Sequence, residues 1–310
     1  GCGCSQGMAT YSISQFLPGV RLFDQPVTYT PDYGPSVSFG LNYRQVRIHF
    51  DSELDDVSTM SNLGAHWSHS FLSYVRAETE DPLPTPDDLR LVSSGGGIKK
   101  YIWNGTTWAT RNSSDAKITW LAPGSGGPGY RVTSTDGSYQ DYTQADAPTP
   151  NRYFLKRIVN AQAQAVTLSY DASYRLVQIT DATGKITSLG YNGADNKITS
   201  ITDPSSRSAT FTYHANGILA SITDTLGITS AFTYNSSAWP GRIATLTTPD
   251  GTTTFTMDGE PSAGYIQNWS VTVTDPHGDV EKVESFYESS KSAALLDELC
   301  NHTPPTSISV

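Results

Sequence analysis

Apolar and polar positions in the second half of the chain follow a phrase that recurs every 21 or 22 residues. Each copy contains a run rich in threonine, aromatic and β-branched residues, and this run ends on a tyrosine and a polar residue. After a turn, a second run ends on an aliphatic residue, a threonine and an aspartate. The tyrosines are Tyr170, Tyr191, Tyr213 and Tyr234. A period of this length predicts stacked supersecondary units.

Both runs predict β-strands, because apolar residues alternate with polar ones among residues that favour extended backbone. The first strands are expected at 165–171, 185–192, 208–214 and 228–235, and the second at 175–181, 197–203, 218–224 and 242–248. An aspartate side chain can bond the backbone two residues on, so five aspartates are assigned to turns. They are Asp181, Asp203, Asp224, Asp250 and Asp275. The pattern predicts a long antiparallel ribbon, with weaker copies of the strands before and after it.

The first 150 residues lack the repeat but still predict strands, which makes the whole chain all-β. These strands are expected at 36–44, 67–75, 89–94, 99–103, 117–121 and 130–134. Near the other end, residues 289–299 have a serine cap and an apolar stripe, which predict a short helix. The chain therefore divides into a β-rich segment at 1–150, a ribbon at 151–288, and a short helix with a tail at 289–310.

Charge and hydropathy exclude two classes of partner. The 310 residues carry a formal net charge of -10, and no run of lysine and arginine exceeds two residues, so nucleic acid is not an expected ligand. No apolar stretch approaches the length that a membrane-spanning helix needs. The chain starts at Gly1 without a basic and apolar leader, which favours a processed or excised piece.

Two pairs of residues that contain histidine are the candidates for chemistry. His66 and His69 would share one face of a helix and could hold a metal, but their aromatic neighbours predict a strand, which places the two rings on opposite sides. His49 and Asp51 could form an acid-base couple, yet no third partner is evident. Structural or surface roles are preferred for both pairs. The chain has no serine-nucleophile elbow, zinc-protease helix or phosphate-binding loop.

The three cysteines lie at the two ends of the chain. Cys300 could bridge to Cys2 or Cys4, and the odd count leaves one thiol over. Together with His302 they also have ligand types that suit zinc. The spacing is unusual for zinc, so we prefer free terminal thiols and predict no metal and no cofactor. Glycines 95–97 lie between two expected strands and predict a hairpin turn.

The tyrosines and aspartates of the repeat admit two interpretations each. On adjacent strands the tyrosines form a column whose cross-strand contacts stabilise the sheet, whereas an exposed column would offer flat platforms for sugar rings. The aspartates recur at one register and could form an acidic ladder for Ca²⁺. Turn formation is preferred, because each aspartate has its own local glycine or proline turn to serve.

The tyrosine-aspartate phrase resembles the Rhs/YD-repeat family. The stretches 63–71 and 136–142, with the glycine-led openings at Gly7 and Gly34, look like the segment that precedes the repeats in that family. The resemblance implies the pre-repeat segment and first repeats of a large bacterial protein. It further implies a β-ribbon that spirals into a hollow shell, which encloses a toxin in some members; other members are adhesion proteins, and carbohydrate binding has been ascribed to the repeats.

The departures from the family pattern limit what it implies here. About half a dozen repeats suffice for an arc of a shell but not for a closed one. No self-cleaving core follows, because Asp275-Pro276-His277-Gly278 stands at a turn position of the repeat and precedes a further expected strand. Self-cleavage is therefore not expected.

These observations predict a non-enzymatic structural segment of an extracellular or secreted shell or scaffold. Its partners would be neighbouring repeats or copies of the same protein. Two alternatives remain open: a carbohydrate-binding or adhesion module that uses the tyrosine column to bind glycans, and a self-assembling surface or filament subunit.

Overall fold

The structure is a computed structural model that describes residues 7–14, 19–45, 60–77, 88–93, 95, 97–110, 116–146, 152–193, 195–235, 241–258 and 269–285. Within these ranges the chain forms twenty-three β-strands, and every strand pairing is antiparallel. The all-β prediction is confirmed. The expected helix at 289–299, the cysteines, and His49 with Asp51 lie outside the described residues.

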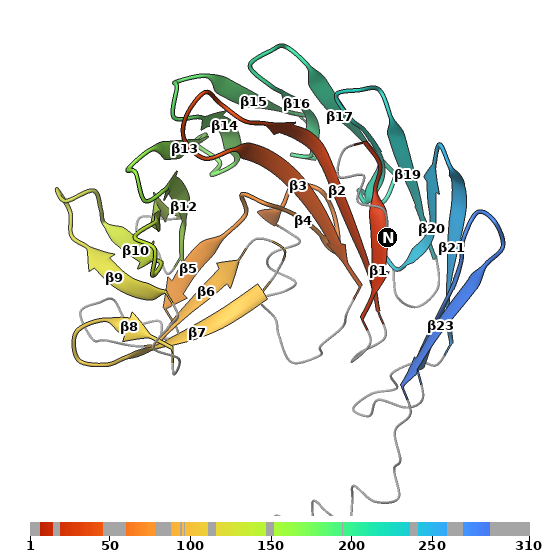
Figure 1. The fold of residues 1–310 in the computed structure, drawn as a ribbon, viewed down its shortest axis with the longest axis horizontal. Helices are drawn as coiled ribbons and strands as arrows, with labels where there is room; N and C mark the ends of the chain where they lie inside the picture. Colours follow the sequence, from red (N-terminus) through yellow and green to blue (C-terminus); the bar gives the residue numbers. More distant parts are fainter. Residues whose placement is uncertain are drawn as a thin grey trace, which may run out of the picture.

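The predicted ribbon is present as a meander in which each strand pairs with the next, and it curves through an arc (Figure 1). Eight strands correspond to the repeat: β13 (Ala165–Tyr170), β14 (Leu176–Thr180), β15 (Ile186–Tyr191), β16 (Ile198–Thr202), β17 (Ser208–Tyr213), β18 (Leu219–Thr223), β19 (Thr229–Tyr234) and β20 (Ile243–Thr248). Three more continue it: β21 (Gly251–Asp258), β22 (Trp269–Thr274) and β23 (Val280–Ser285).

Each second strand of the repeat contains a β-bulge. Ile198 and Ile201 are three residues apart in β16, and both are 0% exposed, although strict alternation would turn one of them outward. The register shifts between Gly190 and Tyr191, so that Thr199 is the extra residue and both isoleucines face the core. The same shift accompanies Tyr170, Tyr213 and Tyr234. The apolar pair at positions i and i+3 is therefore the sequence signature of this bulge.

Strand β12 (Arg152–Val159) joins the ribbon to a smaller ring of strands. One of its edges pairs with β11. The other edge is divided, because residues 152–154 pair with β5 whereas residues 157–159 pair with β13. The sheet thereby closes on itself through β5 (Tyr74–Ala77), β6 (Leu89–Ser93), β7 (Gly97–Trp103), β8 (Trp108–Ala109), β9 (Lys117–Leu121), β10 (Gly129–Thr133) and β11 (Tyr139–Ala145).

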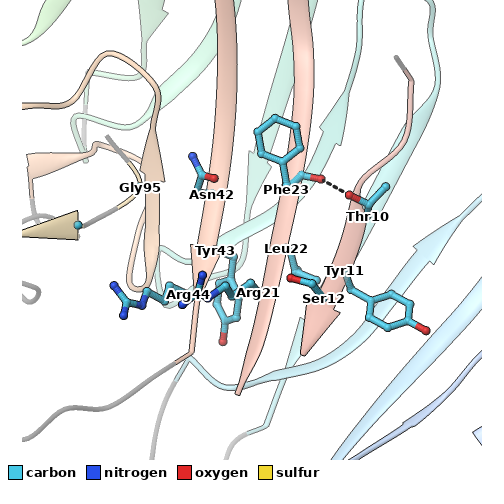
Figure 2. Close-up of a pocket in the computed structure, with 11 residues that line it drawn as sticks. Thr10, Tyr11, Ser12, Arg21, Leu22, Phe23, Asn42, Tyr43, Arg44 and Gly95 are labelled. Atoms are coloured by element: carbon cyan, nitrogen blue, oxygen red, sulfur yellow. Dashed lines mark hydrogen bonds between the residues drawn. The ribbon is translucent and has the colours of Figure 1, made fainter. Parts of the chain in front are cut away.

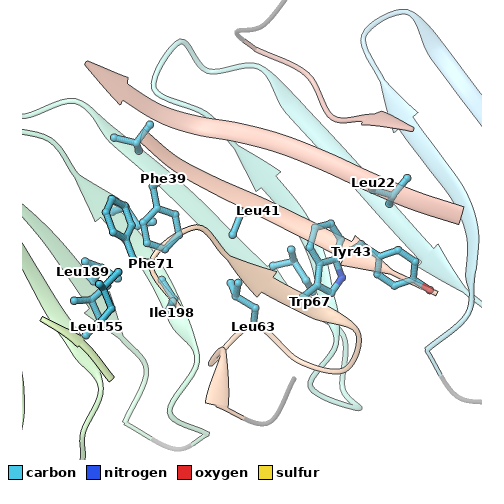
Figure 3. Close-up of a cluster of buried hydrophobic side chains, with 14 of the residues drawn as sticks. Leu22, Phe39, Leu41, Tyr43, Leu63, Trp67, Phe71, Leu155, Leu189 and Ile198 are labelled. Atoms are coloured by element: carbon cyan, nitrogen blue, oxygen red, sulfur yellow. The ribbon is translucent and has the colours of Figure 1, made fainter. Parts of the chain in front are cut away.

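A second, four-stranded sheet lies inside the arc of the ribbon (Figure 1). Its strands are β1 (Thr10–Ile13), β2 (Val20–Tyr29), β3 (Val37–Arg44) and β4 (Trp67–His69). One face of this sheet packs on the concave face of the ribbon, and the side chains between them belong to one continuous hydrophobic core. Figure 3 shows Phe39, Leu41 and Tyr43 of β3 above Leu189 and Ile198 of the ribbon.

Two differences from the sequence prediction concern this inner sheet. The expected strand at 67–75 is wrong in its extent, because it divides into β4 and β5, which belong to different sheets. A turn at Ser70–Phe71 separates them. Strands β1 and β2 were not expected, and β2 is interrupted by a register shift between Asp24 and Val27, at Pro26. The domain boundary near residue 150 stays a prediction, although the shared core spans both sides of it.

Glycine lets the two layers approach closely. Gly64 has a φ of +98°, and a Cβ atom at this position would lie 2.5 Å from the carbonyl oxygen of Gly217 in the turn between β17 and β18. Gly34 makes a similar approach to Ala182, in the turn between β14 and β15. Glycine is required at such positions because any side chain would separate the layers.

We expect Gly64→Ala to destabilise the fold by about 1–3 kcal/mol more than Gly105→Ala does, because only the first substitution forces a methyl group into a packed interface. Both glycines have a φ of +98°, so an alanine suffers the same backbone strain at either position. A Cβ atom on Gly105 would have no other atom within 4 Å, so only Gly64→Ala adds a steric clash. Urea denaturation of the two variants measures the difference. Equal losses of stability would mean that the layers do not meet at Gly64.

Candidate functional site

The tyrosine column lies on the core side of the ribbon rather than on its outer surface. Tyr170, Tyr191, Tyr213 and Tyr234 are half-buried and pack against the hydrophobic core. Burial raises the pKa of all four phenols above the ordinary value of 10. A phenol that stays protonated in this environment can donate a hydrogen bond at every physiological pH.

Each tyrosine hydroxyl donates to a backbone carbonyl that lies 15 residues earlier in the chain. The four bonds run from Tyr170 to Leu155 (2.6 Å), from Tyr191 to Leu176 (2.7 Å), from Tyr213 to Ile198 (2.5 Å), and from Tyr234 to Leu219 (2.7 Å). All four carbonyls, on Leu155, Leu176, Ile198 and Leu219, belong to the residues at which the strands bulge. A bulge interrupts the regular backbone hydrogen bonds between two strands, and the tyrosine hydroxyls bond backbone carbonyls at these interruptions.

The inner sheet completes the column at its last member. Trp67 of β4 donates from Nε1 to the hydroxyl of Tyr234 at 2.8 Å. The hydroxyl of Tyr43, on β3, donates to the carbonyl of Gly241 (2.6 Å) and accepts from the amide of Ile243 (2.9 Å). Tyr43 thus hydrogen-bonds the backbone at the start of β20, just as the ribbon tyrosines hydrogen-bond the backbone of earlier strands. Sequence reasoning missed this role, because Tyr43 lies outside the repeat.

The turn aspartates form hydrogen bonds within their own turns. In Asp181, Asp203, Asp224 and Asp275, Oδ1 accepts from the amides two and four residues on, at 2.8 to 3.0 Å. Asp250 differs: it is exposed in the short turn between β20 and β21, where its own amide donates to Thr248 Oγ1 at 3.3 Å. Within the described parts of the chain, no group of three or more histidine, cysteine, aspartate or glutamate side chains could hold a metal.

The histidine pair lies beside this core. His69 is 4% exposed, its ring stacks on Phe39 with 4.9 Å between centroids, and burial lowers its pKa from 6.5 to about 3. His66 precedes β4 and has a φ of +66°. Its ring contacts the ring of Tyr43 edge to face, with 5.9 Å between the two ring centroids. A neutral, stacked imidazole packs as a core side chain.

Asp24 is a buried carboxylic acid between the layers that the sequence did not single out. It lies on β2 and is 3% exposed, and Oδ1 accepts the amide of Gln25 at 2.6 Å. Burial raises its pKa from 3.8 to about 7; the Gln25 bond opposes this shift, and the negative charge of Asp224 adds to it. The neighbouring contact between the layers is a hydrogen bond from the amide of Thr225 to the carbonyl of Pro26.

Comparison with known families identifies the repeat. The RHS Repeat family model matches residues 191–229, from the last residue of β15 to the first residue of β19. Residues 191–229 therefore form an RHS repeat. No curated protein sequence matches the chain. Among the described residues, no helix has both the length and the apolar character needed to cross a lipid bilayer.

Two solved structures are similar to this chain. One is the crystal structure of TcdB2-TccC3, at 12% identity and a TM-score of 0.42, with 89% of this chain and 16% of that chain covered. The other is the Tc holotoxin pore of Photorhabdus luminescens, at 12% identity and a TM-score of 0.31, with 91% of this chain and 15% of that chain covered. The chain thus spans about a sixth of the length of these structures.

Tyr213→Phe removes one hydroxyl of the column and leaves its aromatic packing in place. We expect a loss of about 1–2 kcal/mol in the free energy of unfolding, because the carbonyl of the buried Ile198 loses its bond from the phenol. Tyr174→Phe is the matched control, since this tyrosine is 43% exposed in the turn between β13 and β14. Urea denaturation tests both variants, and an unchanged Tyr213→Phe midpoint would exclude a stabilising role for the bond.

Asp24→Asn tests the buried acid through pH. Because the folded chain binds the Asp24 proton more tightly than the unfolded chain, its contribution to stability is complete below about pH 4 and is lost as the pH rises to about 7. Asparagine mimics the protonated acid at every pH. The variant should therefore gain stability over the parent protein as the pH rises, by up to about 1.4 kcal/mol per unit.

Urea denaturation at pH 4.5 and pH 8 measures this gain. Asp250→Asn, at an exposed turn position, controls for the change in net charge. If the advantage of Asp24→Asn over the parent protein is the same at both pH values, the acid does not titrate between them in the folded chain.

Proposed function

We propose that this protein is a non-enzymatic structural segment of an extracellular shell or scaffold. Its role would be passive: the curved ribbon forms a wall, and the inner sheet lines part of that wall. One observation carries the proposal: the polar side chains of the repeat hydrogen-bond the chain's own backbone. These side chains are the tyrosine hydroxyls and most of the turn aspartates. Side chains engaged in this way maintain a shape.

The convex face of the ribbon supports the same proposal. Its residues are mostly threonine and serine, and hydroxyls on neighbouring strands bond one another at 2.6 to 2.9 Å. The pairs are Thr202 with Ser208, Thr212 with Ser221, Thr223 with Thr229, Thr233 with Thr245, and Thr247 with Thr252. A hydroxyl-covered face suits the solvent-exposed side of a wall, and cross-strand hydroxyl pairs stabilise a sheet.

The structure gives unequal support to the two alternatives, glycan binding and self-assembly. Glycan binding by the tyrosine column is disfavoured, because the rings lie against the core and the hydroxyls already bond backbone carbonyls. Self-assembly is favoured by β23, whose described pairing is with β22 and whose Val280 is 64% exposed. A strand edge of this kind can pair with further repeats or with a copy of the same chain.

Electron microscopy of the native protein, purified from the medium or the cell surface, tests the proposal. We expect one continuous curved wall that resists proteolysis. Ile201→Asp places a charge in the core and should open the wall to protease, whereas Ser200→Asp, at its half-exposed neighbour, should leave the wall closed. Separate globular modules in the images would contradict the shell, and a protein found only in the cytosol would contradict the extracellular assignment.

A further inference from the structure

Strand β2 holds the inner sheet against the turns of the ribbon, and its second half has fewer backbone partners than its first. Residues 20–23 pair with β1, and residues 21–23 also pair with β3 on the other side. Figure 2 shows where this stretch ends, because Thr10, the first residue of β1, bonds the carbonyl of Phe23. Within the described part of the chain, residues 24–29 pair with β3 alone, and a register shift at Pro26 interrupts this pairing.

Hydrogen bonds connect residues 24–29 with the ribbon at two points. The amide of Thr225, in the turn between β18 and β19, donates to the carbonyl of Pro26 at 3.3 Å. The hydroxyl of Thr187, on β15, donates to the hydroxyl of Tyr29 at 3.2 Å. Pro26 has no amide of its own to donate. A segment with so few bonds can open locally while the rest of the structure stays folded.

A buried carboxylic acid lies at the start of this segment. Phe23 is 45% exposed on one face of β2, whereas Asp24 is 3% exposed on the opposite face. Its partner across the sheet is the apolar Leu41, and its Oδ1 accepts the amide of Gln25. No cationic side chain among the described residues forms an ion pair with it. Burial, and after it the charge of Asp224, raises the pKa of this acid to about 7.

The charges on the ribbon turns that face β2 do not offset an ionised Asp24. The turn between β18 and β19 places Asp224 near it, and this aspartate is 6% exposed. The two preceding turns on this side carry the buried carboxylates Asp181 and Asp203. Both act on the phenol of Tyr29, and the second already pairs with Arg207. Ionisation of Asp24 therefore adds a second negative charge to a buried interface, where like charges repel strongly.

We propose that residues 24–29 of β2 form a pH-dependent latch between the inner sheet and the ribbon. The latch is closed while Asp24 is protonated and opens when this acid is ionised. Opening admits water to the carboxylate and separates it from Asp224, so the loss of the proton and the opening favour each other. The ribbon and its tyrosine column stay folded in both states. The latch does not depend on the proposed shell, so either can fail without the other.

Hydrogen exchange of the 310-residue protein, followed by mass spectrometry at pH 5.5 and pH 8, tests the latch. After correction for the intrinsic effect of pH on exchange, peptides that cover residues 20–29 should exchange at least about tenfold faster at pH 8. The opening constant rises about tenfold per pH unit between the ordinary pKa of an aspartate and the raised pKa of Asp24. Peptides that cover residues 186–202 of the ribbon should remain protected over the same labelling times.

Asp24→Asn should keep the latch closed and remove the acceleration at pH 8. Asp250→Asn is the matched control, because it removes the same charge from an exposed turn and should leave the acceleration intact. Thermal unfolding at pH 5.5 confirms that both variants are folded. The latch is overturned if Asp24→Asn retains the acceleration, or if Asp250→Asn abolishes it. Exchange of residues 20–29 and 186–202 at one common rate would also overturn it, because the whole chain would then be unfolding.

Discussion

The hydrogen bond from a tyrosine hydroxyl to a bulged strand is the interaction on which the ribbon depends. Each second strand buries apolar residues at positions i and i+3, such as Leu219 and Ile222, and this is possible only if the strand bulges between them. A bulge interrupts the ladder next to a buried position, where an unpaired carbonyl is costly. The hydroxyl of Tyr234 bonds the carbonyl of Leu219 at that point. The core and the column therefore require each other.

The ribbon is apolar on its concave face and so needs a second layer to bury that face. The inner sheet provides this layer, and it repeats the chemistry of the ribbon from another part of the chain. Tyr43 bonds the backbone at Gly241 and Ile243, and Trp67 bonds the last tyrosine of the column. Contacts across more than 150 residues of sequence thus join the two segments. The first segment acts as the inner wall of the same core.

The sequence predicted the features that depend on local periodicity. The strands of the repeat and the turn aspartates such as Asp203 follow from alternation and from turn chemistry, both of which are readable within one unit. Strand β2 was missed because Pro26 argues against a strand; the structure accommodates this proline where the register shifts. The direction in which the tyrosines face, and the bond from Tyr43 to Gly241, depend on contacts between distant segments. No local pattern encodes such contacts.

The tyrosine bonds also explain why the period alternates between 21 and 22 residues. The separation between each tyrosine and its carbonyl acceptor is 15 residues in all four bonds. The span from Leu176 to Tyr191 is one such fixed unit, and it contains a strand, an aspartate turn and the next strand. The extra residue must then fall outside the unit, after Tyr191, where the turn is longer. There the side chain of Asn192 accepts hydrogen bonds from the amides three and five residues on. In the shorter turn after Tyr170, the side chain of Asp171 accepts from the amides two and four residues on. Length varies only where no tyrosine bond spans the chain, so the invariant element of this repeat is the bonded hairpin.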